Sequence, residues 1–124
     1  MAAKADPRVL AGLRFLIVED EMLLALDLEM LLKDQGCVVL KPTNSIQRAL
    51  EAIDAEHPDA ATLDMNLNGS SSAPVAAALH ARNIPFVAVT GYTGSFDEDP
   101  AFQDVTVVKK HTIRESFFRR SRAC

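Results

Sequence analysis

Four short apolar runs, each ending on a polar residue of a different chemical type, constrain the fold of this chain most. The runs are residues 15–18, 60–63, 85–89 and 105–108, and they are followed respectively by Glu19-Asp20-Glu21, Asp64, Thr90-Gly91 and Lys109-Lys110. Amphipathic segments of helical length separate most of these runs. Strands that alternate with helices predict a parallel sheet with right-handed crossovers.

The intervening segments have apolar residues at three- and four-residue spacing, which predicts helices at about residues 21–35, 45–56, 75–82 and 112–122. Ser45 is a suitable N-cap for the second helix, and Pro74 suits the first turn of the third. Residues 37–40 form a short β-branched run that predicts one more strand. Met22 and Met30 fall at helical spacing in the first helix, so we expect them in the core.

The resulting fold class is α/β, with a doubly wound five-stranded parallel sheet of order 2-1-3-4-5, flavodoxin-like, and helices on both faces. Residues 91–100 contain two glycines, a proline and three adjacent acids, so the fourth helix is expected to be short or replaced by a loop. In this topology the first and third strands are neighbours, and ligands bind at the carboxyl ends of the strands. Glu19, Asp20 and Asp64 are therefore expected to meet.

The composition restricts the possible binding partners of this chain more than it restricts the fold. A chain of 124 residues fits one domain, which we place at 13–124 after a flexible leader at 1–12. The net charge of −4 argues against binding to nucleic acid or to an anionic membrane, and the apolar run near the N-terminus is too short to cross a bilayer. Cys37 and Cys124 have no metal-ligand or disulfide spacing, which favours a reducing cytoplasm.

Three carboxylates brought together repel one another unless their pKa values rise or a cation binds between them. A site with few protein oxygens at the lip of an open cleft suits Mg²⁺ better than Ca²⁺. Lys109 or Lys110 adds a positive charge and Thr90 a hydroxyl, which together describe a phosphoryl-transfer site with Asp64 as the nucleophile. The simpler alternative is that Asp64 only caps a turn with Asn66.

These motifs, in this order, resemble the receiver domain of two-component response regulators over about residues 13–122. The resemblance rests on Leu16-Ile17-Val18-Glu19-Asp20-Glu21, Leu63-Asp64-Met65-Asn66-Leu67, Val89-Thr90-Gly91 and Val107-Val108-Lys109-Lys110. It implies that Asp64 accepts phosphate from a histidine kinase or a histidine phosphotransfer protein. It further implies the other site roles: Asp20 and Asp64 as direct Mg²⁺ ligands, Glu19 as a ligand through water, the Asn66 backbone carbonyl as the last protein ligand, Thr90 as the switch hydroxyl and Lys110 as the site lysine.

Two departures from the family pattern concern the end of the last strand. His111 stands where the family usually has a proline after the lysine, often with a cis bond, which leaves both that geometry and the choice between Lys109 and Lys110 open. Alignment of the preceding residues favours Lys110. Val107 occupies a position that is often aromatic, while Pro85 to Tyr92 is similar in part to the FAT GUY subgroup, in which Tyr92 is either a gating residue or an exposed loop aromatic.

The resemblance implies a stand-alone, Mg²⁺-dependent phosphoacceptor rather than a conventional enzyme. Without an attached output domain, it would signal by contact with an unknown output protein or act as a phosphate sink. The alternative is a degenerate receiver that never carries phosphate and serves as a binding scaffold. A flavodoxin-like enzyme is disfavoured because no glycine-rich phosphate loop follows the first strand.

Overall fold

The polypeptide alternates strands and helices in the order that the sequence predicts. The structure is a computed structural model that describes residues 11–91 and 99–123, with the side chains of the last helix described as far as residue 116. The strands are β1 (Arg14–Val18), β2 (Val38–Val39), β3 (Ala60–Asp64), β4 (Asn66–Leu67), β5 (Ser70–Ser71), β6 (Phe86–Thr90) and β7 (Val107–Lys109). The helices are α1 (Met22–Asp34), α2 (Ile46–Glu56), α3 (Ala73–Ala81) and α4 (Lys110–Ala123), with a 3-10 turn, η2, at Pro100–Phe102.

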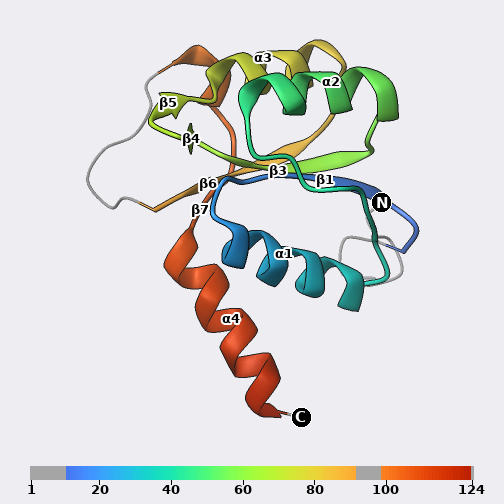
Figure 1. The fold of residues 1–124 in the computed structure, drawn as a ribbon, viewed down its shortest axis with the longest axis vertical. Coiled ribbons are helices and arrows are strands. Elements are labelled where there is room, and N and C mark those ends of the chain that lie inside the picture. Colours follow the sequence, from blue (N-terminus) through green and yellow to red (C-terminus); the bar gives the residue numbers. More distant parts are fainter. Residues whose placement is uncertain (1–10, 92–98, 124) are drawn as a thin grey trace.

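Five strands form one parallel sheet in the order β2-β1-β3-β6-β7 (Figure 1). The central strand, β3, pairs with β1 and β6, so that Val18 lies opposite Leu63 and Asp64 lies opposite Val89. Every residue of β3 is buried, as expected for a parallel strand covered on both faces. The predicted doubly wound sheet of order 2-1-3-4-5 is confirmed, and Asp64 is the last residue of its central strand.

Helices cover both faces of the sheet and enclose two hydrophobic clusters. Figure 1 shows α2 and α3 on one face and α1 and α4 on the other. Alternation along β1 sends Leu16 and Val18 into the larger cluster with α2 and α3, whereas Ile17 packs in the smaller cluster with α1 and Ile113 of α4. The predicted cap is also present, because the Ser45 side chain accepts the N–H of Arg48 at 3.1 Å. These clusters fix the strands whose ends carry the polar residues.

The expectation that Met22 and Met30 lie in the core is wrong. Their exposed fractions are 76% and 53%, whereas the buried residues of α1 are Leu24, Ala25 and Leu28. Helix α1 is apolar on more than one side, and the sheet and α4 cover only one of those sides. Leu23 and Leu26 join the methionines in an exposed group of four residues, here called the α1 apolar face.

Helix α4 begins at Lys110, about two residues earlier than predicted, so β7 passes directly into the helix. A proline at position 111 would disfavour a helical conformation at Lys110. His111 imposes no such restriction, and no peptide bond among the described residues is cis. The site lysine predicted from the sequence is consequently the first residue of a helix. Strand β7 begins later than predicted, at Val107, which lies partly exposed on this edge strand.

A small hairpin follows β3, and the elements predicted from the sequence do not include it. Strands β4 and β5 pair in antiparallel fashion around Asn68 and Gly69, whose φ angles are 53° and 87°. Positive φ at both central residues, with the sequence Asn-Gly, is typical of a tight two-residue hairpin turn. This hairpin carries Asn66 and Asn68 past the end of β3.

Two predicted segments lie largely outside the described residues. Of the leader, the structure describes only Ala11 and Gly12, and the Gly12 N–H donates to the Gly36 carbonyl at 2.8 Å. Of the loop predicted at 91–100, residues 92–98 lie outside the description, including Tyr92; the short turn η2 follows, with Phe102 buried. None of the helices among the described residues is both long and apolar enough to cross a membrane.

Candidate functional site

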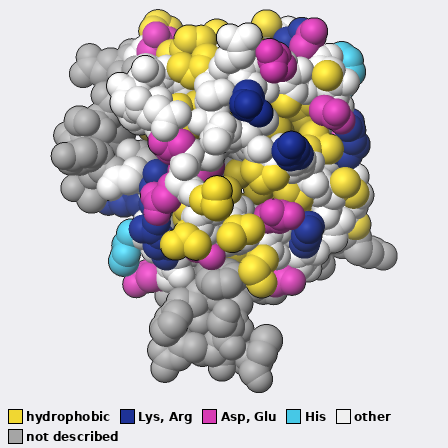
Figure 2. Space-filling model, in the orientation of Figure 1, with side chains coloured by type: hydrophobic (Ala, Val, Ile, Leu, Met, Phe, Trp, Pro, Cys, Tyr) yellow, Lys and Arg dark blue, Asp and Glu magenta, His cyan; other side chains and the backbone are white. Residues whose placement is uncertain are grey.

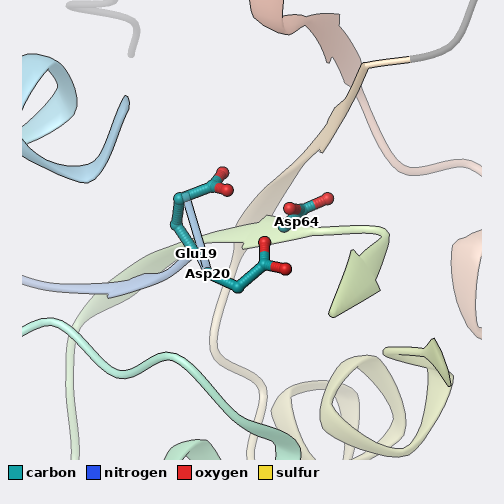
Figure 3. A group of neighbouring side chains, drawn as sticks. All are labelled: Glu19, Asp20 and Asp64. Carbon is teal, nitrogen blue, oxygen red and sulfur yellow. The ribbon is translucent and has the colours of Figure 1, made fainter. Parts of the chain in front are cut away.

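Three acidic side chains meet at the carboxyl edge of the sheet, where the sequence predicts them. Glu19 and Asp20 directly follow β1, and Asp64 ends the neighbouring strand β3. Each offers one carboxylate oxygen to a group whose members all lie within 4.8 Å of one another (Figure 3). Glu19 and Asp64 are each only 3% exposed, while Asp20 lies nearer the surface. The site is thus a dense cluster of three carboxyl groups, two of them buried and one partly exposed.

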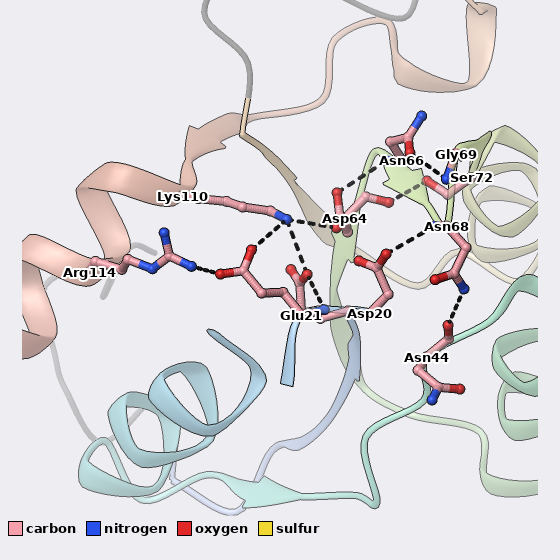
Figure 4. Close-up of polar contacts among 11 residues, drawn as sticks. Asp20, Glu21, Asn44, Asp64, Asn66, Asn68, Gly69, Ser72, Lys110 and Arg114 are labelled. Atoms are coloured by element: carbon pink, nitrogen blue, oxygen red, sulfur yellow. Dashed lines mark hydrogen bonds and ion pairs between the residues drawn. The ribbon is translucent and has the colours of Figure 1, made fainter. Parts of the chain in front are cut away.

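Lys110 reaches into this cluster from the first turn of α4. Its Nζ lies 3.0 Å from Asp64 Oδ2 and 3.2 Å from Glu19 Oε2 (Figure 4). A Cβ added at Gly91 would lie 3.4 Å from Lys110 Cδ, so the lysine stem runs close against the end of β6. Lys109 is exposed. Of the two lysines that the sequence leaves open, Lys110 is therefore the one in contact with Asp64.

Two further charged residues contact the cluster, and neither is predicted from the sequence to belong to the site. Glu21 Oε2 lies 3.4 Å from Lys110 Nζ, and Glu21 Oε1 forms an ion pair with Arg114 of α4 (Figure 4). No sequence signal reports this contact, because it depends on the direction in which α4 leaves β7.

Hydrogen bonds from the hairpin region hold the Asp64 backbone and side chain. The Asn66 N–H donates to Asp64 Oδ1 at 3.1 Å, and the hydroxyl of the fully buried Ser72 donates to the Asp64 carbonyl at 2.5 Å. The Asn68 N–H donates to Asp20 Oδ2 at 2.9 Å. Strand β3 and the start of α3 are thereby joined through Ser72, a residue that the sequence analysis does not single out. Its position immediately before the third helix was the available signal.

The electrostatics of the cluster follow from burial and like charge. Burial, together with the neighbouring Asp64 carboxyl, raises the pKa of Glu19 from 4.5 to about 8. Burial also raises the pKa of Asp64, although hydrogen bonds and the Lys110 charge oppose the rise. Partial burial favours the neutral form of Asp20, but hydrogen bonds led by that from the Asn68 N–H outweigh it and lower the pKa.

Lys110 responds to the same cluster in the opposite sense. Burial alone would lower its pKa, but the contacts with Asp64 and Glu19 outweigh that effect and raise the pKa. Lys110 therefore carries a full positive charge at neutral pH. Around it stand the four carboxyl groups of Glu19, Asp20, Glu21 and Asp64, with Arg114 as the other contacting cation. The four carboxyl groups at the site thus outnumber the two cations, Lys110 and Arg114.

The donor set fits a hard divalent cation. Glu19 Oε1 is buried and has no hydrogen-bond partner in the part of the chain that the structure describes, a costly arrangement for a carboxylate oxygen. All the side-chain donors in the cluster are oxygens, and these are few, as in sites where Mg²⁺ retains several waters. The Asn66 N–H donates to Asp64 Oδ1, and the Asn66 side-chain oxygen accepts the Gly69 N–H. The Asn66 backbone carbonyl remains only a predicted metal ligand.

Thr90 is the last residue of β6 and is buried at the same edge of the sheet. It follows Val89, which pairs with Asp64, and it lies opposite Lys109 in the pairing with β7. Its predicted role as a switch hydroxyl stays a prediction. The gating role considered for Tyr92 falls outside the described residues.

Comparison with known proteins agrees with this geometry. The family model for the response regulator receiver domain matches residues 15–110. Among solved structures, SdrG from Sphingomonas melonis Fr1 is 37% identical with a TM-score of 0.70, and the match covers 86% of this chain and 97% of that one. No match was found among curated proteins. The partial similarity to the FAT GUY subgroup is not shown by these comparisons.

Two further structures were solved in states relevant to the site. A structure of SdrG from Pseudomonas melonis Fr1, described as a BeF3-activated conformation, is 35% identical with a TM-score of 0.68 and covers 87% of this chain and 97% of that one. The receiver domain of sensor histidine kinase PA1611 from Pseudomonas aeruginosa PAO1, with magnesium coordinated in its active-site cleft, shares the fold at 19% identity. Its TM-score is 0.67, with 88% of this chain and 97% of that one covered.

Proposed function

We propose, because the chain belongs to the response regulator receiver domain family, that Asp64 accepts a phosphoryl group from a histidine kinase or a histidine phosphotransfer protein. Receiver domains are signalling modules rather than conventional enzymes. The observation that carries the proposal is the position of Asp64: a buried carboxylate at the carboxyl edge of the sheet, 3.0 Å from the Lys110 ammonium and grouped with Glu19 and Asp20.

In the proposed reaction, a carboxylate oxygen of Asp64 attacks the phosphorus of a phosphohistidine. The new O–P bond forms as the N–P bond breaks, and the departing imidazole keeps the electron pair and then holds a proton from water. Lys110 offsets negative charge on the transferring group, which is the main way a protein assists phosphoryl transfer. We assign Thr90 the role of hydrogen-bond donor to a phosphoryl oxygen, since it ends the strand beside β3.

Mg²⁺ is the proposed cofactor. Asp20 and Asp64 would hold it directly, Glu19 through water, and Asn66 through its backbone carbonyl. When bound, the ion supplies the positive charge that the cluster lacks. The unpartnered oxygen of Glu19 and the grouping of three carboxylates within 4.8 Å support this assignment, as does the magnesium in the cleft of the PA1611 receiver domain.

The phosphodonor is proposed to contact the α1 apolar face. Met22, the first residue of that face, directly follows Glu21, which contacts Lys110 at the site. Figure 2 shows hydrophobic side chains gathered in this part of the surface, with charged side chains around them. Exposed apolar groups of this kind mark protein contact sites. For output we propose phosphorylation-controlled protein contact or a phosphate-sink role, in the cytoplasm, the compartment favoured by the cysteine content.

The test uses Mg²⁺ and beryllofluoride, a phosphoryl mimic, followed by amide NMR. SdrG has been solved in a BeF3-activated conformation. In this chain we expect the amide signals of Asp64, Met65 and Thr90 to shift on addition of both components, and Asp64→Asn to abolish the response. If the wild-type protein gives no response, or the variant gives an undiminished one, the phosphoacceptor assignment is wrong and the scaffold alternative gains support.

A further inference from the structure

The carboxylate of Glu21 lies between two cations of α4. One oxygen is 3.4 Å from Lys110 Nζ and the other pairs with Arg114 (Figure 4). Lys110 and Arg114 are four residues apart, so they lie on the same side of the first turns of α4. Glu21 itself is the N-cap residue of α1. A single carboxylate thus joins the first turn of α1 to the first turn of α4.

Lys110 holds its ammonium group among three carboxyl groups, with hydrogen bonds to Glu19 and Glu21 and an ion pair with Asp64. An ammonium has three N–H groups, and Lys110 Nζ has three acidic neighbours: Asp64 at 3.0 Å, Glu19 at 3.2 Å and Glu21 at 3.4 Å. Glu21 is the most distant of the three. Its side chain is 40% exposed, against 1% for Glu19 and 3% for Asp64, so water screens its contact with Lys110 most.

A phosphoryl group on Asp64 adds negatively charged acceptor oxygens beside Lys110. The phosphoryl oxygens then compete with the existing carboxylate partners for the ammonium, and the contact with Glu21, the longest and most exposed of the three, is the most easily replaced. Glu21 would then retain Arg114 alone. Since Lys110 is itself the first residue of α4, exchange of its partner acts directly on the first turn of that helix.

We propose that Glu21 is a positioning residue that competes with the phosphoryl group for Lys110, and that this competition couples the placement of α4 against α1 to the occupancy of Asp64. The inference rests on the proposed function. It adds a route by which a phosphoryl group on Asp64 changes the placement of α4. Coupling of this kind is reciprocal, so a partner that binds α4 and draws Arg114 away from Glu21 changes the affinity of the site for its phosphoryl group.

The experiment measures beryllofluoride affinity at saturating Mg²⁺, together with the amide spectrum, in the full chain. Glu21→Gln should bind the mimic about two- to fivefold more tightly, the range expected for loss of a half-exposed ion pair. Before the mimic is added, its amide signals for residues 111–115 should already lie displaced towards their positions in the mimic-bound wild type. The Asp64 amide should not be displaced in this way.

Arg114→Gln supplies a second variant with the opposite sign. Without Arg114, Glu21 is left entirely to Lys110, so the mimic should bind more weakly. In the Glu21→Gln background the same substitution should have no further effect, whereas simple addition of charge effects would weaken binding in both backgrounds. Glu29→Gln is the matched control, because it removes a carboxylate of α1 that pairs with Lys33 at 2.8 Å within the same helix.

The outcomes separate this inference from the proposed function. If wild-type site amides respond to the mimic but Glu21→Gln leaves both the affinity and residues 111–115 unchanged, the coupling is refuted and the phosphoacceptor assignment stands. Additive effects of Glu21→Gln and Arg114→Gln also refute it. If the wild-type site amides do not respond at all, both proposals are overturned.

Discussion

Stability of the metal-free protein should fall as the pH rises from 6 to 8, because of Glu19. The folded-state pKa of this group is about 8, above its ordinary value of 4.5. Between those values the folded protein holds a proton that the unfolded chain has released, so folding binds a proton and higher pH favours unfolding. The stability contributed by the protonated group is complete below about pH 4.5 and is lost as the pH passes through about 8.

The size of the effect follows from the same two values. One group in this window contributes a slope of about 1.4 kcal/mol per pH unit. Between pH 6 and pH 8 the expected loss is about 2 kcal/mol, since the slope flattens near the folded-state pKa. The raised pKa of Asp64 has the same sign, so this group also stabilises the fold more at low pH, within its own titration range. The effect belongs to the metal-free cluster, so Mg²⁺ should restore much of the lost stability at pH 8.

The assay is urea denaturation in the presence of a chelator at both pH values. Wild type and Glu29→Gln should lose stability on going from pH 6 to pH 8, and Glu19→Gln should lose much less. A wild-type stability that stays level or increases over this range would refute the electrostatic account of the cluster. An equal pH slope in Glu19→Gln would show that another group is responsible.

Three other predictions concern single side chains. Lys110→Met should slow phosphorylation of Asp64 by about tenfold or more, because the cation in contact with Asp64 is lost. Lys109→Met, at an exposed position, should behave as wild type. A phosphotransfer time course distinguishes the two variants, and equal rates would contradict the assignment of Lys110. Ser72→Ala should lower the free energy of unfolding by about 1–3 kcal/mol, since its buried hydroxyl donates to the Asp64 carbonyl at 2.5 Å; a change below about 0.5 kcal/mol in urea titration would count against this bond. Leu26→Asp on the α1 apolar face should leave the unfolding midpoint nearly unchanged but slow phosphoryl transfer from a protein phosphodonor, whereas transfer from acetyl phosphate, the control, should not change. Unchanged transfer from both donors would show that the phosphodonor does not contact this face.

Periodicity was sufficient to predict the sheet and its central carboxylate. Alternating strands and helices fixed the order of the strands, and that order alone brings Glu19 and Asp64 together. The Ser45 cap was also readable, because a cap depends on residues within one turn of the helix. These features are determined by short stretches of sequence and by the small number of ways in which such stretches pack.

The features that were missed depend on relations between distant elements. Helix α1 is apolar on more than one side, so its spacing could not show that Leu24 and Leu28 would be buried while Met22 would be exposed. The contact of Glu21 with Arg114 depends on the angle between two helices whose first turns are far apart in sequence. The hairpin is different, since the dipeptide Asn68-Gly69 is a local sequence signal for a tight hairpin turn.

The central claim, that Asp64 is the phosphoacceptor, is tested most directly by intact-protein mass spectrometry after incubation with Mg²⁺ and a small phosphodonor such as acetyl phosphate. The account predicts one added phosphoryl group on the wild-type chain, none on Asp64→Asn and none when Mg²⁺ is removed by a chelator. Phosphorylation of Asp64→Asn to the same extent as wild type, or an unmodified wild-type chain even with its cognate kinase, would contradict it.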